Sequence, residues 1–180
     1  LKFMEMQNAY GINFETRTFY VAGELTEHLG TDLRLRFNML KTYYKAKGEK
    51  ITDITLDVSS PGGTIYSIYG ALDFYTELKR EGVTVNTITN SICMSAATIL
   101  VCGATGTRKA SKRASFMLHD IQVSEVGGTA TQVKNTSQQL MDDQLELFGY
   151  YVEYSSKVDI EEKERNREAK KWIKKYCKTN

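Results

Sequence analysis

The stretch SICMSAAT at residues 91–98 joins a β-like run, residues 83–90, to a short apolar run, residues 96–102. This order of strand, turn and buried helix places Ser95 where free backbone N–H groups and the positive end of a helix dipole gather. A serine hydroxyl at such a turn is well placed to act as an acyl-transfer nucleophile. Serine is also a common helix N-cap, so the stretch alone leaves both interpretations open.

The sequence on either side alternates between strand-like and helix-like patterns. Strand patterns occupy residues 17–25, 51–59, 83–89 and 114–120, and helical patterns occupy residues 26–47, 65–82, 131–155 and 160–175. Residues 121–129 alternate and contain two glycines, which suits a hairpin or an exposed edge. Strands alternating with helices predict successive βαβ units and a largely parallel sheet. We therefore predict one α/β domain over residues 17–180, preceded by an arm at residues 1–16.

Composition narrows the class of protein. The 180 residues are 41% hydrophobic with a formal charge of +2, which argues against a nucleic-acid binder driven by overall charge. No apolar run approaches a membrane span. The three cysteines have no metal-like spacing, and with no visible signal peptide they indicate reduced thiols in a cytoplasmic compartment. Because the chain begins with Leu1, we expect it to be a portion of a longer product.

Two further features bear on Ser95. His119 ends a hydrophobic strand, where catalytic groups project in α/β sheets, although a lone histidine there is often structural. Paired with Ser95, it becomes a candidate general base. Gly62 and Gly63 form a turn whose backbone N–H groups can face a developing oxyanion with no Cβ in the way.

Together these features resemble the ATP-dependent Clp protease proteolytic-subunit family, serine peptidases built on a crotonase-like β/α superhelix. The resemblance covers about residues 17–157, and the order of glycine pair, serine and histidine carries it, with Ser95 and His119 separated by 24 positions. The shared features are Phe19-Tyr-Val-Ala-Gly23-Glu, Ser59-Ser-Pro-Gly-Gly63-Thr-Ile65, Ser95-Ala-Ala-Thr, Met117-Leu-His119 and Gly127-Gly128.

The resemblance assigns a role to each matching position. It makes Ser95 the nucleophile and His119 the general base. The oxyanion hole would consist of the backbone N–H groups of Gly62, Gly63 and Ala96. An extended substrate would pair with Gly63, Thr64, Ile65 and Gln122, and such main-chain pairing reads peptide backbone rather than side-chain identity.

The register of the nucleophile departs from the family pattern. A gapless alignment back from Gly103 and His119 places Met94 on the nucleophile position, and in that register the enzyme would be inactive. Ser-Ala-Ala-Thr instead resembles divergent, phage-type relatives, so we assign Ser95. Cys93 is interpreted as a buried structural thiol.

The family's third catalytic residue, an aspartate, has no match. The corresponding position is Asn166 or Arg167. Three explanations stay open: a Ser–His dyad, an acid supplied by Glu168 or Asp159, or an aspartate beyond Asn180, and we favour the last. Loss of the acid typically lowers turnover about 10⁴-fold.

The predicted function is that of a serine endopeptidase subunit degrading unfolded polypeptides through an acyl-enzyme. The resemblance implies heptameric rings stacked in pairs, with the helix at 131–155 as the ring-to-ring handle. The chain has no GxxxxGK[ST] motif, so an AAA+ unfoldase would use the ATP. We expect no cofactor, metal or membrane contact. Two alternatives are an inactive Clp-like scaffold subunit and a crotonase-type enzyme acting on acyl-CoA thioesters.

Overall fold

A computed structural model describes residues 9–123, 126–156 and 160–177. The fold is mixed α/β, as predicted, and it divides into two compact units, residues 1–117 and 118–180. The first unit carries every strand in the described part of the chain, and the second carries two long helices. A single domain over residues 17–180 stays a prediction.

The main sheet of the first unit has five strands in the order β1-β2-β3-β4-β6. These are β1 (Ile12–Asn13), β2 (Thr18–Ala22), β3 (Asp53–Ser59), β4 (Thr84–Thr89) and β6 (Arg108–Ala110). Only the β1–β2 pair is antiparallel, so the predicted, largely parallel sheet is confirmed. A separate parallel pair consists of β5 (Ile92–Met94) and β7 (Ser115–Met117).

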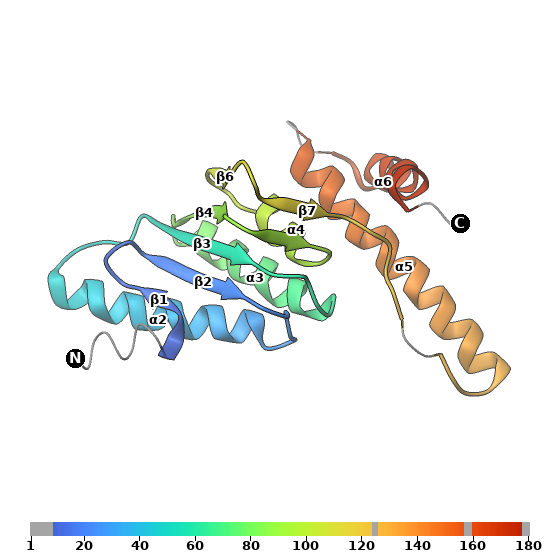
Figure 1. Ribbon diagram of the computed structural model, residues 1–180, viewed down its shortest axis with the longest axis horizontal. Helices are drawn as coiled ribbons and strands as arrows, with labels where there is room; N and C mark the ends of the chain where they lie inside the picture. Colours follow the sequence, from blue (N-terminus) through green and yellow to red (C-terminus); the bar gives the residue numbers. More distant parts are fainter. Residues whose placement is uncertain (1–8, 124–125, 157–159, 178–180) are drawn as a thin grey trace. The chain divides into compact units, whose positions relative to one another are not determined.

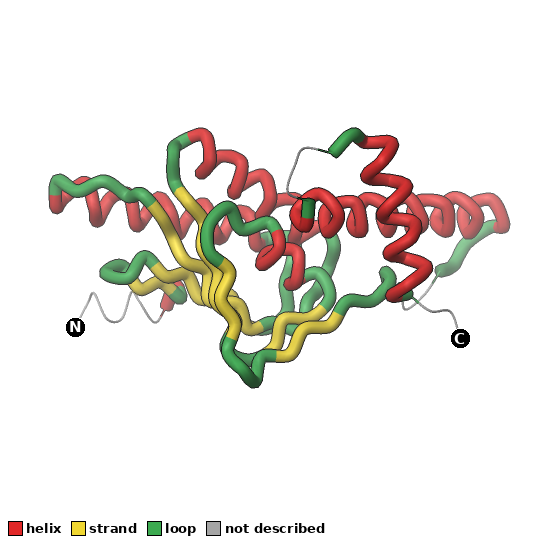
Figure 2. Tube along the Cα trace, turned by 90° about the horizontal axis from the view of Figure 1, so that it is seen from above, coloured by secondary structure: helices red, strands yellow, loops and turns green. Residues whose placement is uncertain are grey.

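Two helices, α2 (Leu29–Lys47) and α3 (Tyr66–Arg80), pack on one face of this sheet. Figure 1 shows them running along β2, β3 and β4, and Figure 2 shows both on the same side of these strands. Every second residue of β3, namely Ile54, Leu56 and Val58, is fully buried. The period of two puts these side chains on the helix-covered face and leaves the opposite face more polar.

The short helix α4 (Ala97–Cys102) follows β5 and is almost entirely buried. The Tyr75 hydroxyl donates to the Leu100 carbonyl (3.0 Å), which ties α4 to α3. The Arg108 guanidinium donates to carbonyl oxygens at the end of α4, including that of Cys102 at 2.7 Å. The C-terminal half of this helix is thus held by α3 and by Arg108 of β6.

The second unit contains α5 (Ala130–Ser155) and α6 (Glu162–Tyr176). Thr129 and Gln132 form a capping box at the start of α5, which fixes where that helix begins. Arg165 of α6 is paired with Glu153 of α5 (3.2 Å). None of the helices in the described ranges combines the length and apolar composition that a membrane crossing requires.

Two local expectations differ from the structure. Ile12 and Phe14 are 1% and 2% exposed, so this part of the predicted arm belongs to the fold, while residues 1–8 lie outside the described residues. The hairpin or edge predicted for 121–129 is wrong for the residues described there, which form no strand. Instead of pairing with a strand, the Ile121 N–H donates to the Gln144 side chain of α5 (3.1 Å).

The contact between α2 and α3 depends on two glycines. A Cβ on Gly30 would lie 2.5 Å from the Gly70 carbonyl carbon, whereas a Cβ on Gly70 would lie 3.3 Å from Gly30 Cα. We expect Gly30→Ala to lower the free energy of unfolding by about 2 kcal/mol through overpacking.

In Gly70→Ala, a gain in helix propensity of about 1 kcal/mol offsets the milder crowding. Its free energy of unfolding should change by less than about 1 kcal/mol. Urea unfolding measures both variants, and equal losses would contradict the close approach at Gly30.

Candidate active site

Ser95 lies at the junction of β5 and α4 with a backbone φ of +51°. A residue with a Cβ is disfavoured in this left-handed region by about 1–2 kcal/mol, so its surroundings must hold it there. The Ser95 N–H donates to the Met117 carbonyl (2.7 Å). Its carbonyl accepts from the Thr98 N–H (3.0 Å) and the Thr98 hydroxyl (2.7 Å). A serine on a strained strand-to-helix turn is the arrangement of a nucleophile elbow.

The Ser95 side chain does not cap α4. The N-cap position belongs to Ala96, and no side chain accepts a capping hydrogen bond there. Within the described residues of the first unit, the Ser95 hydroxyl has no hydrogen-bond partner. Met94, which the gapless alignment places at the nucleophile position, is the last residue of β5 and pairs with Met117. The residue at the turn itself is Ser95.

The glycine turn (residues 60–63) packs directly against Ser95. Gly62 has a φ of +102°, and a Cβ there would lie 2.7 Å from the Cβ of Ser95 and 2.8 Å from the Met94 carbonyl oxygen. Only glycine both adopts this positive φ readily and has no Cβ to clash with Ser95. The turn is anchored on its other side by Leu25, whose N–H donates to the Gly62 carbonyl (2.8 Å).

The three N–H groups predicted to form an oxyanion hole differ in availability. That of Gly62 donates to the Ser60 hydroxyl (3.1 Å) and is therefore occupied. Those of Gly63 and Ala96 have no acceptor among the described residues of the first unit. Two N–H groups thus remain beside Ser95, one from the glycine turn and one from the residue after the serine.

The predicted substrate-pairing segment is shorter than expected. The Thr64 N–H donates to the Leu25 carbonyl (3.1 Å), and the Thr64 carbonyl accepts from the Ser67 hydroxyl (2.6 Å). Ile65 already has helical backbone angles at the start of α3. The N–H and carbonyl of Gly63 have no partner among the described residues of the first unit, because the bridge to Leu25 is made by the Gly62 carbonyl and the Thr64 N–H.

His119 and Gln122 belong to the second unit. The His119 Nδ1 atom is buried and has no hydrogen-bond partner among the described residues of that unit. Gln122 is exposed. The preceding Ile121 is held by its hydrogen bond to Gln144.

The candidate acids differ in their surroundings. Glu168 Oε1 accepts from Lys171 Nζ (2.7 Å), with Arg167 Nε at 3.6 Å. The hydrogen bond from Lys171 holds the pKa of Glu168 below its usual range. Glu168 is therefore engaged with cations of its own helix, which argues against it as the partner of His119. Asp159 lies outside the described residues.

Cys93 lies in β5, two residues before Ser95, and is fully buried. Burial raises the pKa of its thiol to about 12. The thiolate is the nucleophilic form of cysteine, so Cys93 stays protonated and inert at neutral pH. This environment agrees with a structural thiol rather than a rival nucleophile. In the described ranges, no group of three His, Cys, Asp or Glu side chains is placed to hold a metal ion.

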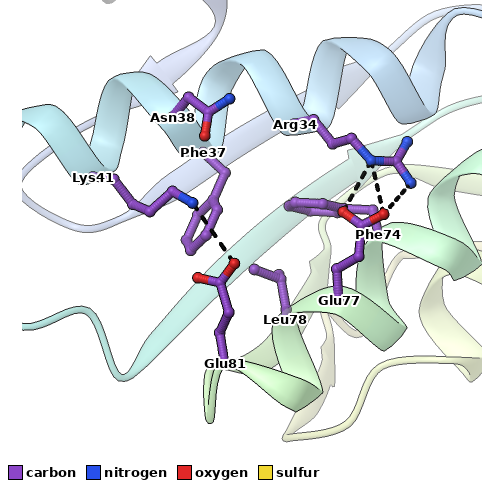
Figure 3. A pocket seen from close by; sticks show the side chains of 8 residues that line it. All are labelled: Arg34, Phe37, Asn38, Lys41, Phe74, Glu77, Leu78 and Glu81. Atoms are coloured by element: carbon purple, nitrogen blue, oxygen red, sulfur yellow. Dashed lines mark hydrogen bonds and ion pairs between the residues drawn. The ribbon is translucent and has the colours of Figure 1, made fainter.

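A small polar cavity of about 110 Å³ lies between α2 and α3. Figure 3 shows its charged side chains turned toward one another, with Arg34 paired to Glu77 (2.7 Å) and Lys41 to Glu81 (3.6 Å). Each of these ion pairs joins a side chain of α2 to one at α3. The cavity is lined by neither Ser95 nor the glycine turn, and we assign it to helix packing.

Three features of the site were not predicted from the sequence: the Ser60 side chain, the Thr98 hydroxyl and the Met117 carbonyl. Ser60 lies in the Ser-Pro-Gly-Gly motif, but the motif indicated no role for its side chain. Thr98 stands three residues after Ser95, a spacing at which a threonine hydroxyl commonly bonds a backbone carbonyl, and this signal was available in the sequence. The Met117 carbonyl that holds Ser95 had no sequence signal.

The fold and the turn define an α/β domain with a strained serine beside a candidate oxyanion-binding turn. The family model for Clp protease matches residues 4–175. The chain therefore belongs to the Clp protease family, and the predicted resemblance is confirmed.

Relatives among curated proteins carry the name ATP-dependent Clp protease proteolytic subunit. The one from Porphyromonas gingivalis is 27% identical over 122 residues, covering 67% of this chain and 53% of that protein. The one from Bacteroides thetaiotaomicron is 27% identical over 103 residues, covering 57% of this chain and 46% of that protein. The chain spans about half the length of the curated relatives it matches.

The left-handed backbone of Ser95 makes a testable prediction. Ser95→Ala keeps the strained Cβ, whereas Ser95→Gly removes it, so the glycine variant should unfold with a free energy about 1 kcal/mol higher. At exposed Ser91, which has no positive φ, glycine should be the less stable variant. Urea unfolding of the four variants tests this, and the same order at both positions would contradict it.

Proposed function

We propose that the chain is a serine-type peptidase subunit that cleaves unfolded polypeptides, with Ser95 as nucleophile and His119 as general base. The observation that carries the proposal is the strained Ser95 packed against Gly62, beside the N–H groups of Gly63 and Ala96, which have no acceptor among the described residues of the first unit. Membership of the Clp protease family supports peptidase activity.

In the proposed reaction, Ser95 Oγ attacks the peptide carbonyl carbon while its proton passes to His119. The carbonyl π electrons move to oxygen, and the N–H groups of Gly63 and Ala96 donate to the resulting oxyanion. Collapse of this intermediate breaks the C–N bond, and the leaving amine takes the proton from His119. Water then hydrolyses the acyl-enzyme by the same proton route, which regenerates the Ser95 hydroxyl.

An inactive scaffold subunit is the second candidate. The observation that favours it is the His119 Nδ1 atom, which has no acceptor among the described residues of its unit. In a catalytic triad that atom donates to the carboxylate that fixes the tautomer. We rank this candidate second because a scaffold has no need for a strained serine beside free N–H groups.

A fluorophosphonate probe tests the nucleophile. We expect the probe to label wild type at Ser95, Ser95→Ala to be unlabelled, and His119→Ala to react at least about 10³-fold more slowly. The matched control Ser91→Ala should react like wild type.

Labelling of Ser95→Ala at the wild-type rate would overturn the proposal. A folded, unlabelled wild type would favour the scaffold, and turnover of acyl-CoA thioesters would favour the crotonase-type alternative.

We also propose stacked heptameric rings served by an AAA+ unfoldase, within a crotonase-like superhelix whose handle is α5. An apolar cavity of about 350 Å³ along α5 supports the handle role. Its lining includes Val133, Leu140 and Met141, and Met141 is 57% exposed. An exposed apolar surface of this kind on a helix marks a protein contact.

Met141→Asp should therefore separate the rings and about halve the particle mass measured by light scattering, because it puts a charge into an apolar contact. Asn135→Asp adds the same charge at an exposed position of α5 outside the cavity and should leave the mass unchanged. Equal masses for both variants would contradict the handle role, and a wild-type monomer at high concentration would contradict chamber proteolysis.

A further inference from the structure

Ser60 is fully buried, and each of its polar groups is hydrogen-bonded. Its N–H donates to the Ile92 carbonyl (2.9 Å), and its carbonyl accepts from the Met94 N–H (3.0 Å). Its hydroxyl donates to the Gly23 carbonyl (2.6 Å) and accepts from the Gly62 N–H (3.1 Å). One residue thus joins the chain after β2, the strand β5 and the glycine turn.

The hydroxyl of Ser60 determines which N–H of the turn remains free. A hydroxyl has a single proton, which goes to the Gly23 carbonyl, and a lone pair then receives the Gly62 N–H. This bond fixes the peptide plane before Gly62, and the next N–H, that of Gly63, is left without an acceptor among the described residues of the first unit.

The backbone of Ser60 holds the other half of the site. It bonds both ends of β5, and β5 ends at Met94, the residue before Ser95. The turn that contains the Gly63 N–H and the strand β5 that leads to Ser95 are therefore both hydrogen-bonded to the same buried residue, Ser60. Oxyanion donors act only when they lie within a few tenths of an ångström of the position that the oxyanion will occupy.

We propose that Ser60 is a positioning residue of this site, and the inference rests on the proposed function above. Its hydroxyl engages the Gly62 N–H and so presents the Gly63 N–H as the turn's single donor to the oxyanion. Ser60 touches no reacting atom. Its loss should therefore lower kcat and leave KM nearly unchanged, because the interaction it supports is made in the transition state.

Ser60→Ala tests the inference with two readouts, cleavage of a short fluorogenic peptide and the rate of fluorophosphonate labelling at Ser95. We expect kcat and the labelling rate to fall about 10- to 100-fold, less than for outright removal of an oxyanion donor, with KM within about twofold of wild type. Tyr75→Phe is the matched control, since it also removes a buried hydroxyl bonded to a backbone carbonyl, that of Leu100. Its kcat should match wild type at a similar cost in stability.

A second pair separates the hydroxyl from the packing. Ser60→Thr keeps the hydroxyl, and Ser60→Val has the same shape without it. We expect Ser60→Thr to label about 10-fold faster than Ser60→Val at equal folded fraction. Equal rates for this pair, or a Ser60→Ala variant as active as Tyr75→Phe, would overturn the positioning role. A wild-type chain unlabelled at Ser95 would instead overturn the proposed function.

Discussion

No side chain fits between the glycine turn and Ser95, and the arrangement of the site follows from this constraint. Parallel strands end at a common edge, and the register pairs Ala22 of β2 with Ser59 of β3. The turn after β3 therefore lies beside the chain that follows β2, where the Gly23 carbonyl accepts a hydrogen bond from the Ser60 hydroxyl. Gly62 can then lie against Ser95 because it has no Cβ and tolerates a φ of +102°.

The strain at Ser95 is small compared with the packing that holds it. A left-handed serine costs about 1–2 kcal/mol. Ile99 and Leu100 of the following helix are fully buried, and burial of each such side chain contributes about 1.5–3 kcal/mol. Two side chains of α4 therefore suffice to offset the backbone strain. The core fixes the direction in which α4 leaves the turn, and the turn geometry of Ser95 follows from it.

The sequence predicted those elements that bury a periodic apolar face. In α2, the spacing of Leu33, Phe37, Leu40 and Tyr44 predicted the helix, and all four side chains are buried. The strand β6 was missed because its three residues are all exposed and show no pattern. The role of Ser60 could not be predicted from the sequence for another reason. Its hydroxyl bonds Gly23, 37 positions away, and such a contact exists only once the parallel strands have aligned.

The Nδ1 atom of His119, which has no partner among the described residues of its unit, bears on the rate of the proposed reaction. A buried polar atom without a partner costs about 1–3 kcal/mol, so its presence at a candidate general base marks the place where an acceptor belongs. Glu168, bound to Lys171, is poorly suited to that role. In serine proteases that have lost a triad member, the oxyanion hole and substrate binding still accelerate acyl transfer about 10³–10⁴-fold over water. In the proposed mechanism, the acceptor for Nδ1 therefore sets the rate of catalysis at Ser95 and not its existence.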